Sequence, residues 1–266
     1  MKHIIAVSSY EQLAYVSQNA DCVIQGAKLL ACNGNFTATS TVIKPRGLCR
    51  GKSPQGDGFG ALPRGLITVI YSPFEYTKTD VESFVKRCML PVYLNLPVIA
   101  RGKDIELLKS INISNYVINN PYGFELAKGK NIILGTGLNI INNGFSGHRI
   151  LGLESKTFFE STDIVYAFGR PVVMSFCHKP PPALIDDHGA KFKILRTKLI
   201  NSYYNMYNNL PINVLPLLKQ KKTLGKVGLL YDFTSYDINE LKKFKYEDLL
   251  DPKYPSTRGH LYRGVE

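Results

Sequence analysis

The sequence contains no long apolar run and no leader-like N-terminus. A membrane-spanning helix needs roughly 18 consecutive apolar residues, and no stretch reaches that length. The apolar part of the opening segment MKHIIAVSSYEQ is too short for a secretory signal peptide and predicts a first strand instead. We therefore expect a chain without a membrane span that works in the cytoplasm.

Cysteine is scarce and scattered. The chain has five, an odd number, and none of them forms a C-x-x-C pair. This arrangement argues against a disulfide framework and indicates reduced thiols, as in a cytoplasmic protein. The five are Cys22, Cys32, Cys49, Cys88 and Cys177.

Short catalytic motifs are missing too. The sequence has no G-x-x-x-x-G-K-[ST], no strand followed by G-x-G-x-x-G, no H-E-x-x-H and no Ser-His-Asp or paired-carboxylate pattern. P-loop, dinucleotide-binding and zinc-protease chemistry therefore have no support from a motif.

What the chain does have is size, an ordinary apolar content and an excess of positive charge. Its 266 residues are 44% hydrophobic and 20% charged, which is typical of a globular protein with a sizeable core. Its 33 Lys and Arg residues exceed 21 Asp and Glu residues, so the net charge is +12. Such a surface favours polyanions such as RNA, or an anionic membrane face; a solvated lysine-rich surface is the alternative.

Short apolar runs alternate with amphipathic segments through residues 1–156. Strands alternating with helices predict a parallel sheet closed as a (β/α) barrel, with functional groups at the carboxyl ends of its strands. One helix is expected over TDVESFVKRC, capped by Thr79. The expected strands are 4–8, 22–26, 65–72, 91–99, 115–120 and 132–138.

From about residue 157 the pattern changes. DIVYAFG and PVVMSF predict consecutive strands, GKVGLLYDF (225–233) a late strand, and SYDINELKKF a helix capped by Ser235. Residues 157–266 are expected to complete the barrel that residues 1–156 begin. The predicted fold class is therefore α/β, a TIM-barrel-like (β/α) barrel with an added C-terminal α+β segment.

Two basic segments are candidates for binding RNA: the glycine-rich loop 44–65 and the tail TRGHLYRGVE (257–266). The glycine-rich loop 44–65 can cradle phosphate with backbone N–H groups, or it is a plain surface insertion. Tyr203, Tyr204 and Tyr207 can stack on bases, although their spacing suits packing in a helix equally well. The candidate RNA-binding residues are Lys44, Arg46, Arg50, Lys52, Arg64, Arg258 and Arg263.

The stretch GRPVVMSFCHKPPPALIDDHGAKF (169–192) raises the question of a thiol site. Cys177 with His178 and His188 would suit zinc, although successive strand residues point to opposite faces. A nucleophile would need His188 or His260 as a base and an orienting acid such as Asp186 or Asp187. Simple burial of a small soft side chain at a strand end is the third interpretation.

The candidate catalytic set adds an arginine to these residues. Arg170 can hold a carboxylate or phosphate through its planar fork, or form a salt bridge with Asp186 or Asp232. The candidates are Cys177, His178, Arg170, Asp186 and His260.

A series of segments also keeps a suggestive order and spacing. They are YLNLPVIARGKD, NYVINNPYGFELAKGKNIILGTGLNIINN, YAFGRPVVMSFCH, IDDHGAKFKI, LINSYYNMYNNL, GLLYDFT and TRGHLYRGVE. Together they resemble the collagenase-like peptidase U32 family, over most of the chain from about residue 90 and more loosely at the start. The resemblance implies a TIM-barrel-like core. The family name implies a protease, whereas several members belong to systems that hydroxylate tRNA, rRNA or the ubiquinone ring.

Those relatives hold an iron–sulfur cluster with four cysteines. Cys177 matches the first of the four, and no cysteine follows it in this chain. We therefore expect no cofactor here, the cluster having been lost. The leading hypothesis is an accessory factor in tRNA or rRNA hydroxylation that works with a cysteine-complete paralogue. A collagenase-like protease and a non-catalytic binding barrel are the alternatives.

Overall fold

Two β-sheets and several short helices make up the described part of the chain. The computed structural model describes residues 2–16, 66–138, 147–152, 162–181, 184–187, 189, 191–218, 227–243, 249, 253 and 255–257. The strands are β1 (Lys2–Val7), β2 (Leu66–Tyr71), β3 (Val92–Asn95), β4 (Asn115–Ile118), β5 (Asn131–Leu134), β6 (His148–Leu151), β7 (Asp163–Gly169), β8 (Val172–Phe176), β9 (Lys193–Lys198), β10 (Ser202–Tyr207), β11 (Ile212–Asn213) and β12 (Gly228–Asp232). The helices are α2 (Lys78–Arg87), α3 (Gly102–Ser110), α4 (Tyr122–Leu126), α5 (Leu215–Leu218) and α6 (Ile238–Lys243), with a 3-10 turn η1 (Thr136–Leu138).

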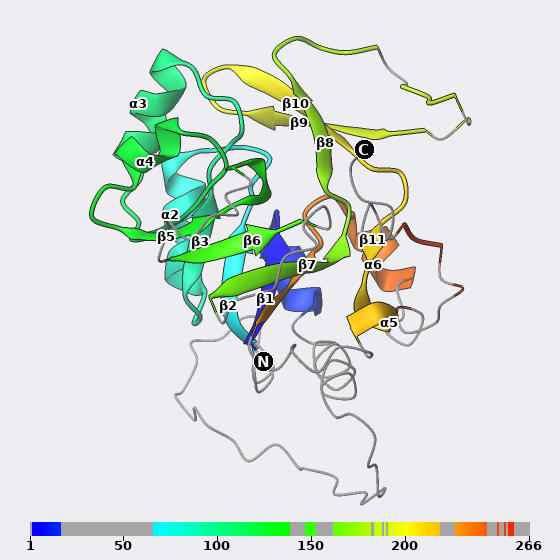
Figure 1. The fold of residues 1–266 in the computed structure, drawn as a ribbon. Coiled ribbons are helices and arrows are strands. Elements are labelled where there is room, and N and C mark those ends of the chain that lie inside the picture. Colours follow the sequence, from blue (N-terminus) through cyan, green and yellow to red (C-terminus); the bar gives the residue numbers. More distant parts are fainter. Residues whose placement is uncertain are drawn as a thin grey trace, which may run out of the picture.

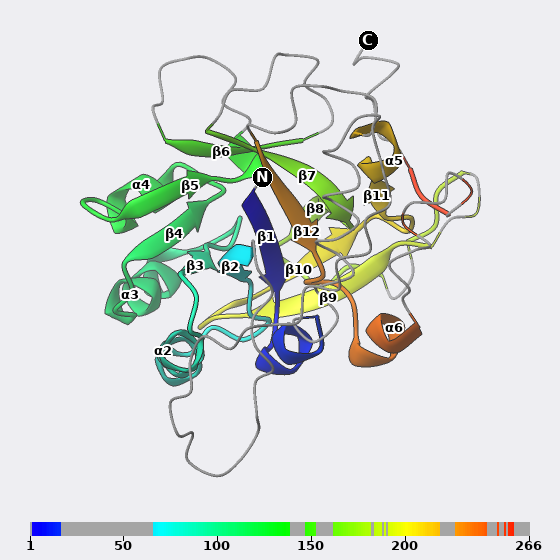
Figure 2. The ribbon, with the colours of Figure 1, turned by 90° about the horizontal axis from the view of Figure 1, so that it is seen from below.

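Eight parallel strands close into a barrel. The ring runs β1-β2-β3-β4-β5-β6-β7-β12, and every neighbouring pair is parallel, including the closing pair β12–β1. Figure 2 shows the ring with α2, α3 and α4 outside it. The predicted TIM-barrel-like α/β fold is confirmed, and so is the parallel pairing of its early strands.

Side chains alternate between the interior of the barrel and the layer under the helices. In β1, Ile4 and Ala6 belong to the interior cluster, whereas Ile5 belongs to the cluster that includes helix residues such as Phe84. This period of two is what a strand dictates, and both sets are buried because the barrel has core on both faces. The interior cluster is Ile4, Ala6, Ile70, Val117, Ile133, Ile150, Ile164, Tyr166 and Leu230.

The caps of two helices differ from those expected. Helix α2 begins after Thr77, whose side chain accepts a hydrogen bond from the Asp80 N–H, so Thr79 lies inside the helix and is not its cap. At α6, Asp237 Oδ1 accepts from Glu240 N–H and Glu240 Oε2 accepts from Asp237 N–H. This reciprocal capping box takes the place of the predicted cap at Ser235.

A second, three-stranded antiparallel sheet is inserted between the last two barrel strands, in the order β8-β10-β9. In Figure 1 it lies beyond the end of the barrel toward which β1 points, which is the carboxyl end of the parallel strands. Residues Ser202–Tyr207 therefore form a strand and not the helix that the tyrosine spacing allowed. The chain returns from this sheet to close the barrel with β12.

The short strand β11 pairs antiparallel with the end of β7. Strand β6 pairs with β7 only as far as Val165. Farther along β7, Phe168 and Gly169 pair with β11 instead. Thr257 then bonds to the β11 segment, donating to Pro211 O at 2.8 Å and accepting from Asn213 N at 3.1 Å. The chain just before residue 258 is thus anchored beside the barrel mouth.

Among the helices that the structure describes, none is long and apolar enough to cross a membrane. The strand expected at 22–26 lies outside the described residues.

Candidate functional site

Polar side chains line the carboxyl ends of β2, β3 and β4. Asn95 Nδ2 donates to Ser72 Oγ at 2.9 Å, and Asn119 Nδ2 donates to Asn95 Oδ1 at 2.6 Å. Barrel enzymes place their functional groups at this rim. Here the amide side chains hydrogen-bond to one another and to Ser72, so they form a polar rim of fixed geometry.

The second sheet packs over this rim. Lys198 N donates to Phe74 O and Tyr76 N donates to Lys198 O, both at 2.8 Å, so β9 is bonded to the loop after β2. Tyr203 and Tyr207 of β10 are buried, and burial raises the pKa of both phenols and of Tyr76. The hydroxyl groups of these tyrosines therefore stay neutral, and their rings are buried beneath the second sheet. Buried rings cannot stack on RNA bases, so that role is excluded for Tyr203 and Tyr207.

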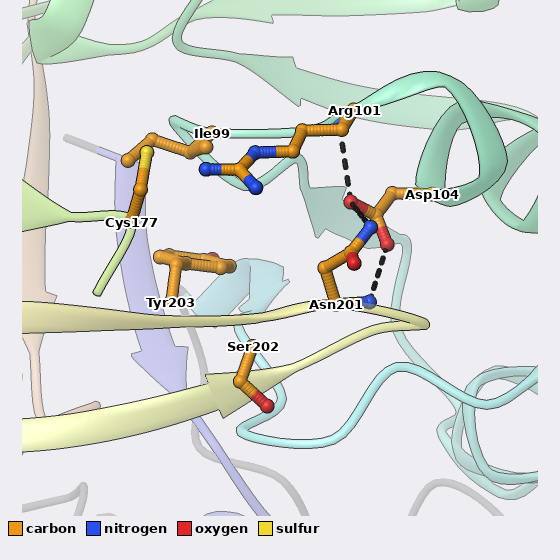
Figure 3. Close-up of a pocket in the computed structure, with 7 residues that line it drawn as sticks. All are labelled: Ile99, Arg101, Asp104, Cys177, Asn201, Ser202 and Tyr203. Atoms are coloured by element: carbon orange, nitrogen blue, oxygen red, sulfur yellow. Dashed lines mark hydrogen bonds between the residues drawn. The ribbon is translucent and has the colours of Figure 1, made fainter. Parts of the chain in front are cut away.

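A small pocket opens where the loop after β3 meets the second sheet (Figure 3). Its closed part has a volume of about 10 Å³, room for about one water molecule, and the rest of it is open to solvent. Three stretches that are far apart in the sequence meet there: 99–104, Cys177 and 201–203. The lining residues are Ile99, Arg101, Asp104, Cys177, Asn201, Ser202 and Tyr203.

Asp104 ties the loop after β3 to the turn between β9 and β10. Its carboxylate accepts from the Arg101 N–H at 3.0 Å and from the N–H and Nδ2 of Asn201 at 2.8 and 3.1 Å. Burial alone would raise the pKa of Asp104, but the hydrogen bonds from Asn201 and Arg101 outweigh it and lower the pKa. The carboxylate is therefore ionised at neutral pH and already committed to its neighbours.

The side chain of Arg101 projects from the N-cap position of α3 and is exposed. In Figure 3 its guanidinium turns away from Asp104 and toward Ile99 and Cys177. Within the described ranges, the ion pairs of the structure do not include Arg101. A guanidinium placed in this way can bind a phosphate or carboxylate through two parallel hydrogen bonds.

Cys177 follows β8 and lines this pocket with an exposed thiol. The interpretation that it is simply a buried side chain at a strand end is therefore wrong. His178 is also exposed but is not among the residues that line the pocket. Asp186 lies in the turn between Ile185 and Lys191, where its carbonyl accepts from Gly189 N–H.

Of the four candidate catalytic residues that the structure describes, only Cys177 lines the pocket. Over the residues that the structure describes, no group of three or more His, Cys, Asp and Glu side chains is placed to hold a metal ion. His188 and His260 lie outside the described residues. The same holds for Lys44, Arg46, Arg50, Lys52, Arg64, Arg258 and Arg263.

Arg170 has a different role from the one expected. Its Nη1 donates to Glu240 Oε1 at 2.8 Å, and its guanidinium carbon lies 4.5 Å from the centre of the Tyr236 ring. Its ion-pair partner is Glu240 of α6 rather than Asp186 or Asp232. The other carboxylate oxygen of Glu240 accepts from Lys193 of β9 at 2.6 Å. We call Arg170, Glu240 and Lys193 the clamp, because together they join the barrel, α6 and the second sheet.

The electrostatics of the clamp are visible at Glu240. Burial would raise the pKa of this carboxyl group, but the hydrogen bonds from Lys193 and Arg170 lower it to about 2. Glu240 is therefore an anion at every physiological pH, which suits a structural tie and not a proton donor.

A second carboxylate near the clamp belongs to Asp232, the last residue of β12. It accepts from the Tyr166 hydroxyl at 2.8 Å and from the Thr234 N–H at 2.9 Å, and burial raises its pKa. Gly169 passes so close that a Cβ would lie 2.4 Å from Asp232 O, and its φ of 138° also requires glycine. The turn after β7 (169–171) and the turn after β12 (232–234) therefore pack tightly against each other at the carboxyl end of the barrel.

Sequence reasoning assigned no role to Arg101, Asp104 or Asn201. Arg101 and Asp104 lie in YLNLPVIARGKD and Asn201 in LINSYYNMYNNL, two of the segments that carry the family resemblance. Cys177 lies in a third, YAFGRPVVMSFCH. Nothing local in the sequence showed that these three segments meet.

No family model, curated protein or solved structure matches the chain.

Proposed function

We propose that this chain is a divergent member of the collagenase-like peptidase U32 family that serves as an accessory factor in the hydroxylation of tRNA or rRNA. A cysteine-complete paralogue would supply the iron–sulfur cluster and the redox chemistry. The chain described here would bind the RNA and hold it at the mouth of its barrel.

One observation carries the proposal. Three of the segments that resemble the family line a single pocket at the carboxyl end of the barrel, although residues 99–104 and 201–203 are about a hundred positions apart. Segments that resembled the family by chance would have no reason to meet at the end of the barrel where functional sites are found. Their convergence supports a shared site.

The chemistry of the pocket favours binding over catalysis by this chain alone. Its one cation, Arg101, is not paired with a described carboxylate, and its one buried acid, Asp104, is held ionised by three hydrogen bonds. A net charge of +12 agrees with a polyanionic partner. A protease would need a base within reach of Cys177, and no histidine lines the pocket as described.

The test is a comparison of RNA from cells with and without this chain. Total tRNA and rRNA are digested to nucleosides and analysed by mass spectrometry. We expect one hydroxylated nucleoside to disappear on deletion, and to return with the wild-type chain and with Lys103→Gln. Asp104→Ala should not restore it, because the loop after β3 is then released from Asn201.

Unchanged nucleosides in the deletion strain would refute the proposal. Purified protein that cleaves gelatin, and loses that activity in Cys177→Ala, would favour the protease instead. The chain purified alone under anoxic conditions should show no charge-transfer absorption in the visible range; a brown protein that loses its colour in Cys177→Ser would show that the cluster is retained.

A further inference from the structure

Arg101 is held so that its cation faces the pocket. Its backbone N–H is bonded to Asp104 Oδ2 at 3.0 Å, and Asp104 is itself only 2% exposed and bonded to Asn201. The backbone from which the side chain projects is therefore rigid. A guanidinium on a fixed backbone loses less conformational entropy on binding an anion than one on a mobile loop.

The neutral side chains around the pocket strengthen the attraction between Arg101 and a bound anion. Tyr203 is 4% exposed, its phenol is neutral, and Ile99 is apolar. Charges interact more strongly beside such groups than in open water. Among the described lining residues Asp104 is the only carboxylate, and its hydrogen bonds direct it to Asn201 and to the backbone of Arg101. A second anion can therefore approach the guanidinium from the open side.

We propose that this pocket is an oxyanion subsite in which Arg101 binds a phosphate group of the RNA backbone. The inference rests on the proposed function for the identity of the anion, and on the geometry for the site itself. The planar fork of an arginine matches two phosphate oxygens, and phosphate contacts fix the register of a bound nucleic acid.

The size of the pocket points to a group and not to a whole ligand. Its closed part, about 10 Å³, holds about one water molecule and is far below the roughly 300–1,000 Å³ of sites that enclose a complete small molecule. Because the pocket is open to solvent, a phosphate can bind at its rim against the guanidinium while the rest of the nucleic acid stays on the surface.

Cys177 offers a built-in reporter for the subsite. Its exposed thiol lines the same pocket, and an anion bound to Arg101 would cover it and shield it from iodoacetamide. The alkylation rate of the peptide that contains Cys177 is measured by mass spectrometry, without additive, with inorganic phosphate and with tRNA.

The matched variants are Arg101→Gln and Lys103→Gln. Both remove one positive charge, and Lys103 is exposed in the same helix but outside the pocket lining. We expect phosphate and tRNA each to slow the alkylation of Cys177 in the wild type and in Lys103→Gln, and to have no effect in Arg101→Gln. The readout is the ratio of the rates with and without the anion, compared between variants, and not the rate itself.

The second arm measures tRNA affinity over a range of salt concentrations. Loss of a charged contact to phosphate in Arg101→Gln should raise the Kd about tenfold and lower the slope of log affinity against log salt by about one. Lys103→Gln should change both much less.

The two arms separate the failure of the subsite from the failure of the proposed function. Protection by inorganic phosphate that depends on Arg101, together with unchanged tRNA affinity, would keep the oxyanion site and overturn its assignment to RNA. Equal protection in Arg101→Gln and in the wild type, or no protection by either anion, would overturn the subsite.

Discussion

Strands β7 and β8 follow one another directly along the chain but lie in opposite environments. Both are apolar, yet every residue of β7 is buried, whereas the first three residues of β8 are exposed. Val172, Val173 and Met174 are 41%, 52% and 52% exposed, and Phe168 of β7 is 0% exposed. Apolar composition therefore did not decide burial here. Position in the barrel or in the added sheet did.

The two regions are also held together by different forces. The barrel is closed by apolar layers on both faces of its strands and contains a buried ion pair, Arg149–Asp163, at 2.8 Å. The added sheet is attached through backbone hydrogen bonds, the tyrosines of β10 and the half-exposed clamp of Arg170, Glu240 and Lys193. The barrel should thus dominate global stability, and the added sheet should be the part that adjusts to a ligand.

The largest effect is expected inside the barrel. Phe168→Ala should lower the free energy of unfolding by about 3–5 kcal/mol, because the side chain is fully buried and leaves a cavity. Urea denaturation measures the change, with Val173→Ala as the control on the exposed strand. Equal losses in the two variants would contradict the contrast between β7 and β8.

A smaller effect is expected at the interface between the two regions. Tyr203→Ala should cost about 2–4 kcal/mol and, more tellingly, speed amide exchange in β8, β9 and β10 while β1 and β12 stay protected. Tyr203→Phe keeps the ring and serves as the control. Exchange that rises equally in barrel and sheet would mean that the two regions unfold as one.

The clamp should make stability depend on acid. The pKa of Glu240 is lowered from 4.5 to about 2 in the folded protein, so its contribution is complete above 4.5 and is lost as the pH falls toward 2. At neutral pH we expect Glu240→Gln to cost about 1 kcal/mol, since the pairs are partly exposed and screened. The difference between the variant and the wild type should shrink on acidification.

Asp232 provides the opposite sign and therefore an internal check. Its pKa is raised above 3.8 by burial, so its contribution is present below 3.8 and is lost as the pH rises through the folded pKa. Denaturation of Asp232→Asn across the same pH range should remove this opposing trend. A variant with an unchanged pH profile would show that Asp232 does not titrate differently on folding.

The smallest effect is expected on the exposed strand. Met174→Lys should change the free energy of unfolding by less than about 0.5 kcal/mol, because the side chain is already half exposed. Thermal denaturation is sufficient to measure it. A large loss would mean that this part of β8 is covered in solution.

The barrel could be predicted from the order of strands and helices along the chain. Runs such as IIAVS and PVYLNLPVI alternate with amphipathic helical segments, and that local period predicts parallel strands because each return to the same edge needs a crossover helix. The sequence also determined the charge and the position of Cys177. Helix caps were less certain, since Thr77 and Thr79 both have the right chemistry and only the backbone distinguishes them.

The added sheet and the site could not be predicted in this way, because both depend on contacts between distant segments. Tyr203, Tyr204 and Tyr207 fit a helix or a strand equally well, and β10 is a strand because it pairs with β8 and β9, contacts that no local pattern encodes. Likewise, Asp104 bonds to Asn201 across 97 positions of the chain and so joins it to the backbone of Arg101. A pocket lined by such distant segments follows from the way the barrel closes, because closure brings the strand ends and the inserted sheet to one place.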